Sequence, residues 1–386
     1  MTFTKNNVGA LLLTLLIAVF FIFLNPFYAL ALASVINLFF KRINPIIFAF
    51  LLSLSFALLF SSRDPATGGD VMFYILRYSG NQGIIYSLSL AFVEPLWSVY
   101  ELIMGIILTK NQDLYVLSSY FLLFLLLTIL ARKISRDKYI IVLFCLVLFN
   151  LGILYGIFQL WRNSFAFLLF FIGIYSSRAK ILIYLSAFVQ VITIPFIIIS
   201  SKINLKVIIA IAIILLIMSS YIFEKIDIFE GSVDQTQFNI YFMLLSILLL
   251  ILRSLKLIKL NRVENNFLYA LILFTLFPLL VETSGALSML YSRMGLVFMF
   301  FGSIMISKFV ISNGLISGLF IIVYSIYRFL ISFNNPDILY NLASIGDNRP
   351  LYAYNGILLL IKNYDSSRWS DFISNNDCIV GILLIC

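Results

Sequence analysis

A polar stretch at residues 61–101 holds the side chains best suited to chemistry in this otherwise apolar chain. A helix beginning near Asp70 would carry Tyr74, Arg77 and Tyr78 on one face, at spacings of four, seven and eight residues. A carboxylate, a guanidinium and two phenols on one face can grip a polar substrate at a membrane surface. The alternative is a solvated loop in which Asp70 only caps the helix.

Two more carboxylates follow at Glu94 and Glu101. Pro95 suits the first position of a helix, and an acid before it complements the positive helix end, so Glu94 has an alternative role as a cap. Glu101 falls seven residues later, on the same face. We therefore expect both carboxylates to face one external cavity, with Arg63 in the preceding loop as a further substrate-binding cation.

Arg162-Asn163 interrupts two apolar runs, and Arg293 has the same character after Tyr291. An arginine inside or beside a membrane span is costly, which makes it a candidate functional residue; the alternative is a side chain that reaches the membrane interface. Two such arginines facing one cavity would suit an anionic phosphate group, which a planar guanidinium binds through two hydrogen bonds.

The composition limits which chemistry is available. Hydrophobic residues make up 62% of the 386 residues and charged residues 11%, so a soluble core of this size lacks enough polar surface. The chain has no histidine and three scattered cysteines, which excludes histidine bases, histidine metal sites and a disulfide framework. We expect no cofactor and no metal; carboxylates, arginines, tyrosines and amides must do the work. The net charge of +9 is interpreted as a topology signal rather than as nucleic-acid binding.

The elements that must position these residues are membrane helices, so the predicted fold class is all-α and polytopic. Apolar runs long enough to span, given flanking residues that reach the interface, number about eleven. The first is interpreted as a retained span rather than a signal peptide. The predicted spans are residues 8–24, 27–40, 45–60, 114–131, 139–158, 163–176, 207–222, 239–252, 266–281, 294–309 and 314–331.

Residues 181–200 decide the orientation of everything after them. As one span they would place the basic loop at 253–262 outside, against the rule that basic loops stay cytoplasmic. We therefore predict a re-entrant hairpin that turns between Gln190 and Pro195. The same count of membrane crossings places residues 94–110 outside, as a horizontal or re-entrant helix.

The predicted organisation is a transmembrane domain over residues 1–331, with an external loop at 61–113, and a tail over 332–386. The amino terminus is expected in the cytoplasm and the tail outside, where its apolar strip and Trp369 suit a helix at headgroup depth.

Several ordered landmarks resemble one enzyme family. Asp70 and Tyr74 precede FVEPLWSVYELI at 92–103, LWRNSFAFLLFFIGI at 160–174, the hairpin with Gln190, and YSRMGLVFMF at 291–300. In order and spacing these resemble EpsG-like and Wzy-type bacterial polysaccharide polymerases, over roughly residues 1 to 331. Members often have Arg-Gln in place of Arg162-Asn163, and a histidine near the position of Gln190. Either the histidine is dispensable here, or Gln190 supplies only its hydrogen bond.

The resemblance implies a glycosyltransferase with a fold akin to the GT-C membrane enzymes. It would be a metal-independent polymerase in the bacterial inner membrane, joining oligosaccharide repeat units carried on undecaprenyl pyrophosphate into O antigen or a related surface polysaccharide at the periplasmic face. It also leaves room for a chain-length regulator as a partner. The alternatives are a flippase or transporter of the same lipid-linked saccharide, and an O-antigen ligase.

On this interpretation the residues divide into two roles. Arg162 and Arg293 would stabilise the charge of the departing pyrophosphate, while Asp70 or Glu94 would take the acceptor proton. The predicted substrate-binding residues are Arg63, Tyr74, Arg77, Tyr78, Glu101, Asn163, Gln190 and Tyr291.

Overall fold

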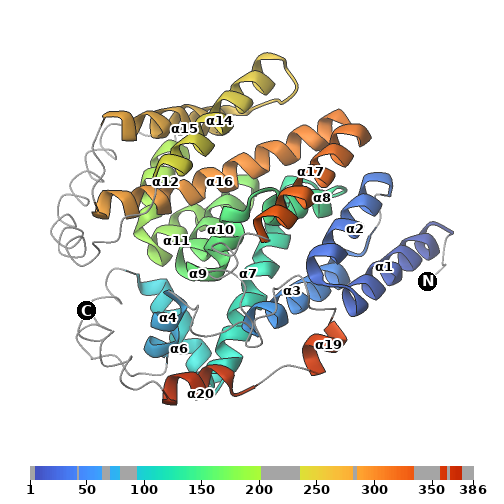
Figure 1. Ribbon diagram of the computed structural model, residues 1–386, viewed down its shortest axis with the longest axis vertical. Helices are drawn as coiled ribbons and strands as arrows, with labels where there is room; N and C mark the ends of the chain where they lie inside the picture. Colours follow the sequence, from blue (N-terminus) through green and yellow to red (C-terminus); the bar gives the residue numbers. More distant parts are fainter. Residues whose placement is uncertain are drawn as a thin grey trace.

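The computed structural model describes residues 5–40, 43–62, 70–78, 94–200, 235–280, 285–333, 357–362 and 366–375. Within these ranges every regular element is a helix, which confirms the predicted all-α class (Figure 1). The predicted span at 207–222 lies outside the described residues. Two described helices, Gln112–Ile134 and Arg293–Asn313, are long and apolar enough to cross a bilayer, and the other apolar helices are shorter.

In chain order the helices are α1 (Lys5–Phe23), α2 (Pro26–Phe39), α3 (Pro45–Ser61), α4 (Asp70–Tyr78), α6 (Pro95–Ile107), α7 (Gln112–Ile134), α8 (Tyr139–Phe144), η2 (Cys145–Phe149), α9 (Leu151–Gln159), α10 (Trp161–Tyr175), α11 (Ile181–Val189), η3 (Val191–Thr193), α12 (Ile194–Ser200), α14 (Gln235–Ser254), α15 (Arg262–Leu280), α16 (Gly285–Asn313), α17 (Leu315–Phe333), α19 (Ile357–Lys362) and α20 (Arg368–Asn375).

The asparagine-proline pairs Asn25-Pro26 and Asn44-Pro45 start α2 and α3. The Asn25 side chain accepts a hydrogen bond from the Phe27 amide at 3.0 Å, and Asn44 accepts from the Ile46 amide at 3.0 Å. The proline that follows each asparagine needs no donor at the first helical position. These caps let the chain reverse direction within a few residues.

The predicted continuous span at 139–158 is broken in the middle. A π-helical turn, η2, follows α8, and Asn150 adopts an extended backbone before α9 begins. The Asn150 side chain accepts from the Gly152 amide at 3.1 Å and donates to the Tyr241 hydroxyl at 2.7 Å. A short amide side chain competes with the helical hydrogen bonds of its own backbone, so this polar residue ends one helix and caps the next.

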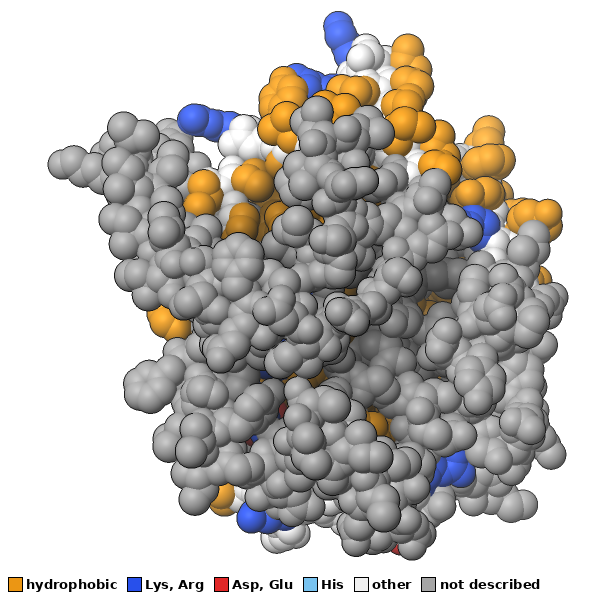
Figure 2. All heavy atoms as spheres, turned by 60° about the vertical axis from the view of Figure 1, so that its left-hand side comes forward, with side chains coloured by type: hydrophobic (Ala, Val, Ile, Leu, Met, Phe, Trp, Pro, Cys, Tyr) orange, Lys and Arg blue, Asp and Glu red, His pale blue; other side chains and the backbone are white. Residues whose placement is uncertain are grey.

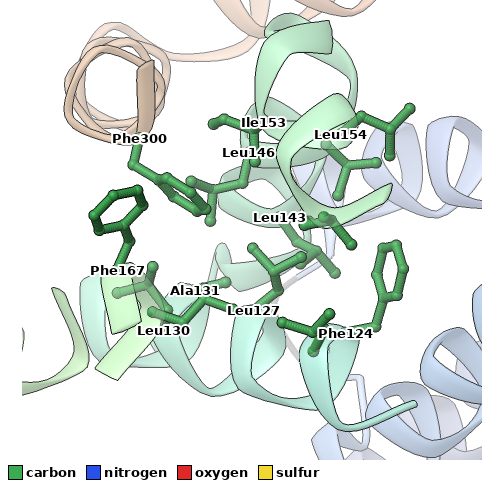
Figure 3. Close-up of a cluster of buried hydrophobic side chains, with 14 of the residues drawn as sticks. Phe124, Leu127, Leu130, Ala131, Leu143, Leu146, Ile153, Leu154, Phe167 and Phe300 are labelled. Atoms are coloured by element: carbon green, nitrogen blue, oxygen red, sulfur yellow. The ribbon is translucent and has the colours of Figure 1, made fainter. Parts of the chain in front are cut away.

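The core lies where α7, α8, α9, α10 and α16 meet. Phe124, Leu127 and Leu130 of α7 point toward Leu143 and Leu146 of the α8–η2 segment (Figure 3). Phe167 and Phe300 close the same cluster from α10 and α16, with ring centroids 6.4 Å apart. All of these side chains are buried.

One end of the molecule gathers basic side chains. The Lys138 ammonium donates to the last carbonyl groups of α2, and Ser312 of α16 donates to the Leu257 carbonyl at 3.1 Å. Lys308 pairs with buried Glu264, which also accepts from the Tyr175 hydroxyl at 2.8 Å. We call this the basic end; its basic side chains include Arg132, Lys138, Lys256 and Lys308.

The opposite end holds the carboxy-terminal helix α20. Trp369 is buried there; its indole donates to the Ser61 carbonyl at the end of α3 and its amide donates to Asp113 at the start of α7, at 2.9 and 2.8 Å. Helices α4 and α6 are found in the same lower-left region of Figure 1 as α20, which contacts the start of α7. We call this the tail end.

Residues 181–200 double back between the two ends. The Gln190 amide, at the end of α11, donates to Asn163 at the start of α10, at 2.6 Å. The returning α12 meets α15 near the basic end, where Asn266 donates to the Ile199 carbonyl at 3.1 Å. The chain therefore turns at Gln190, within the predicted interval.

Large apolar side chains remain on the outside of the helices. On α14, Leu244 is 58% exposed and Ile251 is 49% exposed. Figure 2 shows hydrophobic side chains gathered on the upper part of one face, with Lys and Arg side chains beyond them at the top. Such a surface is compatible with a membrane protein.

Candidate functional site

Glu94 and Arg162 form the centre of the site at the tail end. Glu94 directly precedes α6, and Arg162 lies in the first turn of α10. A carboxylate oxygen of Glu94 accepts a hydrogen bond from Nη1 of Arg162 in a buried ion pair, whose side chains are 6% and 14% exposed. The Glu94 side chain makes no capping hydrogen bond to α6. Glu94 thus occupies the N-cap position of α6 before Pro95, as the sequence predicts, but its carboxylate binds Arg162 instead of capping the helix through a hydrogen bond.

Arg162 is also held by an aromatic ring. Its guanidinium carbon lies 5.3 Å from the ring centroid of Tyr74 in α4, a geometry that favours a cation–π contact. Tyr74 in turn stacks on Trp161, with centroids 5.6 Å apart and ring planes at 23°. The alternative in which Arg162 only reaches toward the membrane interface does not fit a guanidinium enclosed by Glu94 and Tyr74.

The two predicted phenols of α4 are buried rather than open. Tyr74 is 4% and Tyr78 5% exposed. Tyr78 stacks on Tyr115 of α7, with centroids 4.1 Å apart and ring planes at 4°, and its hydroxyl donates to the Met104 carbonyl of α6 at 3.4 Å. Aromatic packing against α7 and α10 covers both phenols, and their predicted role in substrate binding stays a prediction.

Arg77 and Glu101 form a second buried pair. One carboxylate oxygen of Glu101 lies 2.6 Å from Nε of Arg77, and the other accepts from the Trp97 indole at 2.7 Å. Arg77 also donates to the Ser98 hydroxyl at 2.9 Å. These contacts fix α4 against α6 and use both oxygens of the carboxylate. Arg77 and Glu101, predicted to bind substrate, are thus arranged to hold the site together.

The Glu101 environment also shifts its proton affinity. Burial raises the pKa of Glu101 to about 7, because desolvation outweighs the opposing effects of Arg77 and the Trp97 indole.

Helix α6 has 13 residues and a length of roughly 20 Å, too short to span a ~30 Å hydrocarbon layer. Its outward side chains Leu102 and Ile106 are 65% and 71% exposed, which suits an amphipathic helix at a surface.

Asn163 and Gln190 bring the hairpin turn to the site. Both are buried, at 2% and 8% exposure, and their side chains are hydrogen-bonded to each other. Within the described part of the chain, the Asn163 amide nitrogen and the Trp161 indole nitrogen are buried without a hydrogen-bond partner. Buried N–H groups without a partner are uncommon in folded proteins, and a bound ligand that accepts hydrogen bonds from these two would account for them.

Arg293 and Tyr291 enter from α16. Gly156 and Gly152 of α9 pack on Leu296 and Met299, so α16 runs antiparallel to α9. If this packing continues along α9, Arg293 lies toward the tail end, where Arg162 stands in the first turn of α10. Tyr291 is buried and stacks on Phe274, with centroids 4.1 Å apart and ring planes at 6°.

The remaining predicted site residues are Asp70 and Arg63. Asp70 is the first residue of α4, as expected from the spacing of Tyr74, Arg77 and Tyr78. Arg63 lies outside the described residues. The predicted role of each stays a prediction.

The sequence reasoning did not assign roles to several supporting residues. Trp97 lies four residues before Glu101, and this helical spacing could have indicated their hydrogen bond. Tyr115 of α7 packs against Tyr78 and the Trp161 ring, and Ser119 bonds to the Tyr100 hydroxyl at 2.8 Å. No local pattern indicates these contacts, because they join separate helices.

The site can therefore offer a carboxylate, a guanidinium and unused N–H donors in an enclosed aromatic surrounding. Among the described residues no group of three or more Cys, Asp or Glu side chains could hold a metal ion. In comparisons with known proteins, no family model, no curated protein and no solved structure matches this chain.

Proposed function

We propose that this chain is a membrane glycosyltransferase that polymerises lipid-linked oligosaccharide repeat units into O antigen or a related surface polysaccharide. The observation that carries the proposal is the buried Glu94–Arg162 pair under the Tyr74 ring. A buried charge pair has a high desolvation cost, so its retention beside unused donors favours a functional role over a purely stabilising one. The resemblance of residues 1–331 to the polymerases supplies the substrate class.

The proposed topology places the basic end in the cytoplasm and the tail end in the periplasm of a bacterial inner membrane. About eleven helices span the bilayer, and residues 181–200 form a re-entrant hairpin. The clustering of Arg132, Lys138 and Lys256 at one end supports this orientation, because basic loops are retained inside. The doubling back of the chain at Gln190 supports the hairpin.

In the proposed reaction the donor is the growing glycan on undecaprenyl pyrophosphate. A hydroxyl oxygen of the acceptor repeat unit forms a bond to the anomeric carbon of the donor. The bond from that carbon to the pyrophosphate oxygen breaks, and undecaprenyl pyrophosphate leaves as an anion. The acceptor proton passes to a carboxylate.

The Glu94–Arg162 pair can take part in both halves of this reaction. A phosphate oxygen is a strong competitor for a guanidinium, so donor binding would draw Arg162 away from Glu94. The carboxylate would then be available to the acceptor hydroxyl. Arg293 is proposed as the second cation for the leaving group. Asp70 and Glu94 are the two candidate bases, and Asp70 is favoured on sequence grounds.

Arg77 and Glu101 are proposed to position this machinery. Their bonds to each other and to Trp97 and Ser98 hold α6 against α4. This contact fixes both Glu94, at the start of α6, and Tyr74, in the middle of α4. The Asn163–Gln190 bond would fix the hairpin turn beside the same cavity.

The test is polymer formation by the purified protein in lipid nanodiscs supplied with lipid-linked repeat units. The account expects a ladder of longer glycans and release of undecaprenyl pyrophosphate. Arg162→Gln should abolish both. The matched control is Arg253→Gln, which removes an arginine bonded to Tyr269 near the basic end and should leave elongation unchanged.

Other outcomes would point to the alternative functions. Movement of the lipid-linked saccharide across a sealed vesicle membrane, without elongation, would contradict the polymerase and favour a flippase. Transfer of finished glycan to a lipid A–core acceptor, without elongation, would favour a ligase.

A further inference from the structure

A lateral groove between α3 and α7 lies away from the candidate site. It has a volume of about 320 Å³, and its walls include Ile46 and Phe50 of α3 and Phe121, Leu125 and Ile129 of α7. The rings of Phe50 and Phe121 meet at 5.9 Å and join the two helices. The groove is therefore bounded by side chains from both elements.

The interior of the groove offers almost nothing to a polar ligand. Its one hydroxyl, on Thr128, donates to the Phe124 carbonyl of its own helix at 2.9 Å. The wall residues Ile46 and Phe50 are 76% and 54% exposed, so the groove opens sideways on the apolar outer surface of the helices. Chemically, such walls suit a hydrocarbon chain.

A single cation, Arg132, is found among the residues that line the groove. Arg132 lies in the last turn of α7 at the basic end and is exposed. Among the described residues no carboxylate pairs with its guanidinium, in contrast to Arg77 and Arg162. An arginine at the mouth of an apolar groove is complementary to an anionic head group above an acyl chain.

We propose that this groove binds an anionic phospholipid, with an acyl chain between α3 and α7 and the phosphate on Arg132. The proposal rests on the chain lying in a membrane and not on the proposed polymerase activity. The neighbouring Lys133 is also exposed in the last turn of α7 but does not line the groove. It therefore provides a matched control of equal charge.

The experiment measures lipid retention by native mass spectrometry of the detergent-purified protein, with no saccharide substrate present. Phosphatidylglycerol is the anionic probe and phosphatidylcholine the zwitterionic one. We expect wild-type protein to retain phosphatidylglycerol preferentially. Arg132→Gln should lower that preference about fivefold, the effect expected of one juxtamembrane cation, while Lys133→Gln leaves it unchanged.

A wall variant separates the head-group contact from the acyl-chain contact. Phe50→Ala removes a half-exposed ring, so it should weaken retention of both lipids alike while the protein stays folded by its thermal transition. An unchanged phosphatidylglycerol preference in Arg132→Gln would overturn the proposal. An equal loss in Lys133→Gln would also overturn it, because the preference would then follow net charge. Failure of the polymerase assay would leave this result unaffected.

Discussion

Arg162 carries the largest share of the proposed chemistry at the residue scale, because it meets a carboxylate and an aromatic face at once. Removing one partner of a buried ion pair leaves the other charge uncompensated, at a cost of about 3–5 kcal/mol. Alanine variants of Glu94 or Arg162 would therefore report lost stability as well as lost chemistry. Substitutions that keep the shape or the charge are more informative.

Arg162→Lys keeps the charge but loses the planar fork that binds phosphate with two hydrogen bonds. We expect glycan elongation to fall sharply in nanodiscs while expression and membrane insertion stay normal. Elongation at the wild-type rate would show that Arg162 is only a structural partner of Glu94.

The identity of the base is tested by Asp70→Asn and Glu94→Gln, made separately, with donor binding measured in parallel. Asp70 begins α4 and follows a Gly-Gly pair in the sequence, and its place beside Tyr74 and Arg77 makes it the favoured base on sequence grounds. Asp70→Asn should bind donor normally and elongate ~10² to 10⁴ times more slowly. If only Glu94→Gln stalls elongation with binding intact, the roles are reversed.

Residue-level prediction from the sequence succeeded where helical spacing decides the outcome. Tyr74, Arg77 and Tyr78 do share α4, and Pro95 does begin the helix that carries Glu101. The partners could not be predicted, because Glu94 and Arg162 are 68 residues apart and their contact depends on how α6 packs beside α10. Helical spacing predicts which side chains share a helix face, but not which other helix packs against that face.

At the element scale, one carboxylate at the start of α7 ties down helix α20 near the end of the described chain. Asp113 at the start of α7 accepts from the Trp369 amide at 2.8 Å and from the Ser370 hydroxyl at 2.9 Å. Arg368 donates to the Ser62 carbonyl in addition. These bonds join positions more than 250 residues apart in the chain.

Asp113→Ala should release α20 from the tail end. Hydrogen bonds to a charged group contribute about 1.5–3 kcal/mol each, so we expect faster proteolysis at Arg368 and a lower thermal transition. Asp371→Ala is the control, since Asp371 is exposed and accepts a hydrogen bond from Ser367, four residues earlier in the same segment. Equal protection of α20 in wild type and Asp113→Ala would contradict this tether.

Element prediction was most accurate where proline, asparagine or long apolar runs set the boundaries. The starts of α2 and α3 and the turn at Gln190 follow from such signals. The break at Asn150 was not predicted, because a single amide lowers the mean hydropathy of an apolar run only slightly. The structure shows that this amide binds Tyr241 and caps α9, a contact with a distant helix.

At the scale of the whole molecule, the separation of the basic end from the tail end predicts the topology. A reporter fused at Lys256 should read cytoplasm and one fused at Asp234 should read periplasm, because the basic loop between α14 and α15 is retained inside. Reversed reporters would contradict both the re-entrant hairpin and the shared periplasmic site. The packing of the described helices does not by itself determine which end of the molecule faces the cytoplasm. The reporter measurement therefore tests the orientation independently of the fold.

The most direct test of the central claim exchanges the two charges of the buried pair. The double variant Glu94→Arg with Arg162→Glu keeps one cation beside one anion, so we expect it to recover much of the stability that either single variant loses. Stability is measured by thermal unfolding, and elongation with lipid-linked repeat units in nanodiscs. The account predicts a folded double variant that forms no polymer, because the guanidinium no longer meets the pyrophosphate from α10. Polymer formation near the wild-type rate would contradict it, and would show that Glu94 and Arg162 serve only to hold α6 against α10.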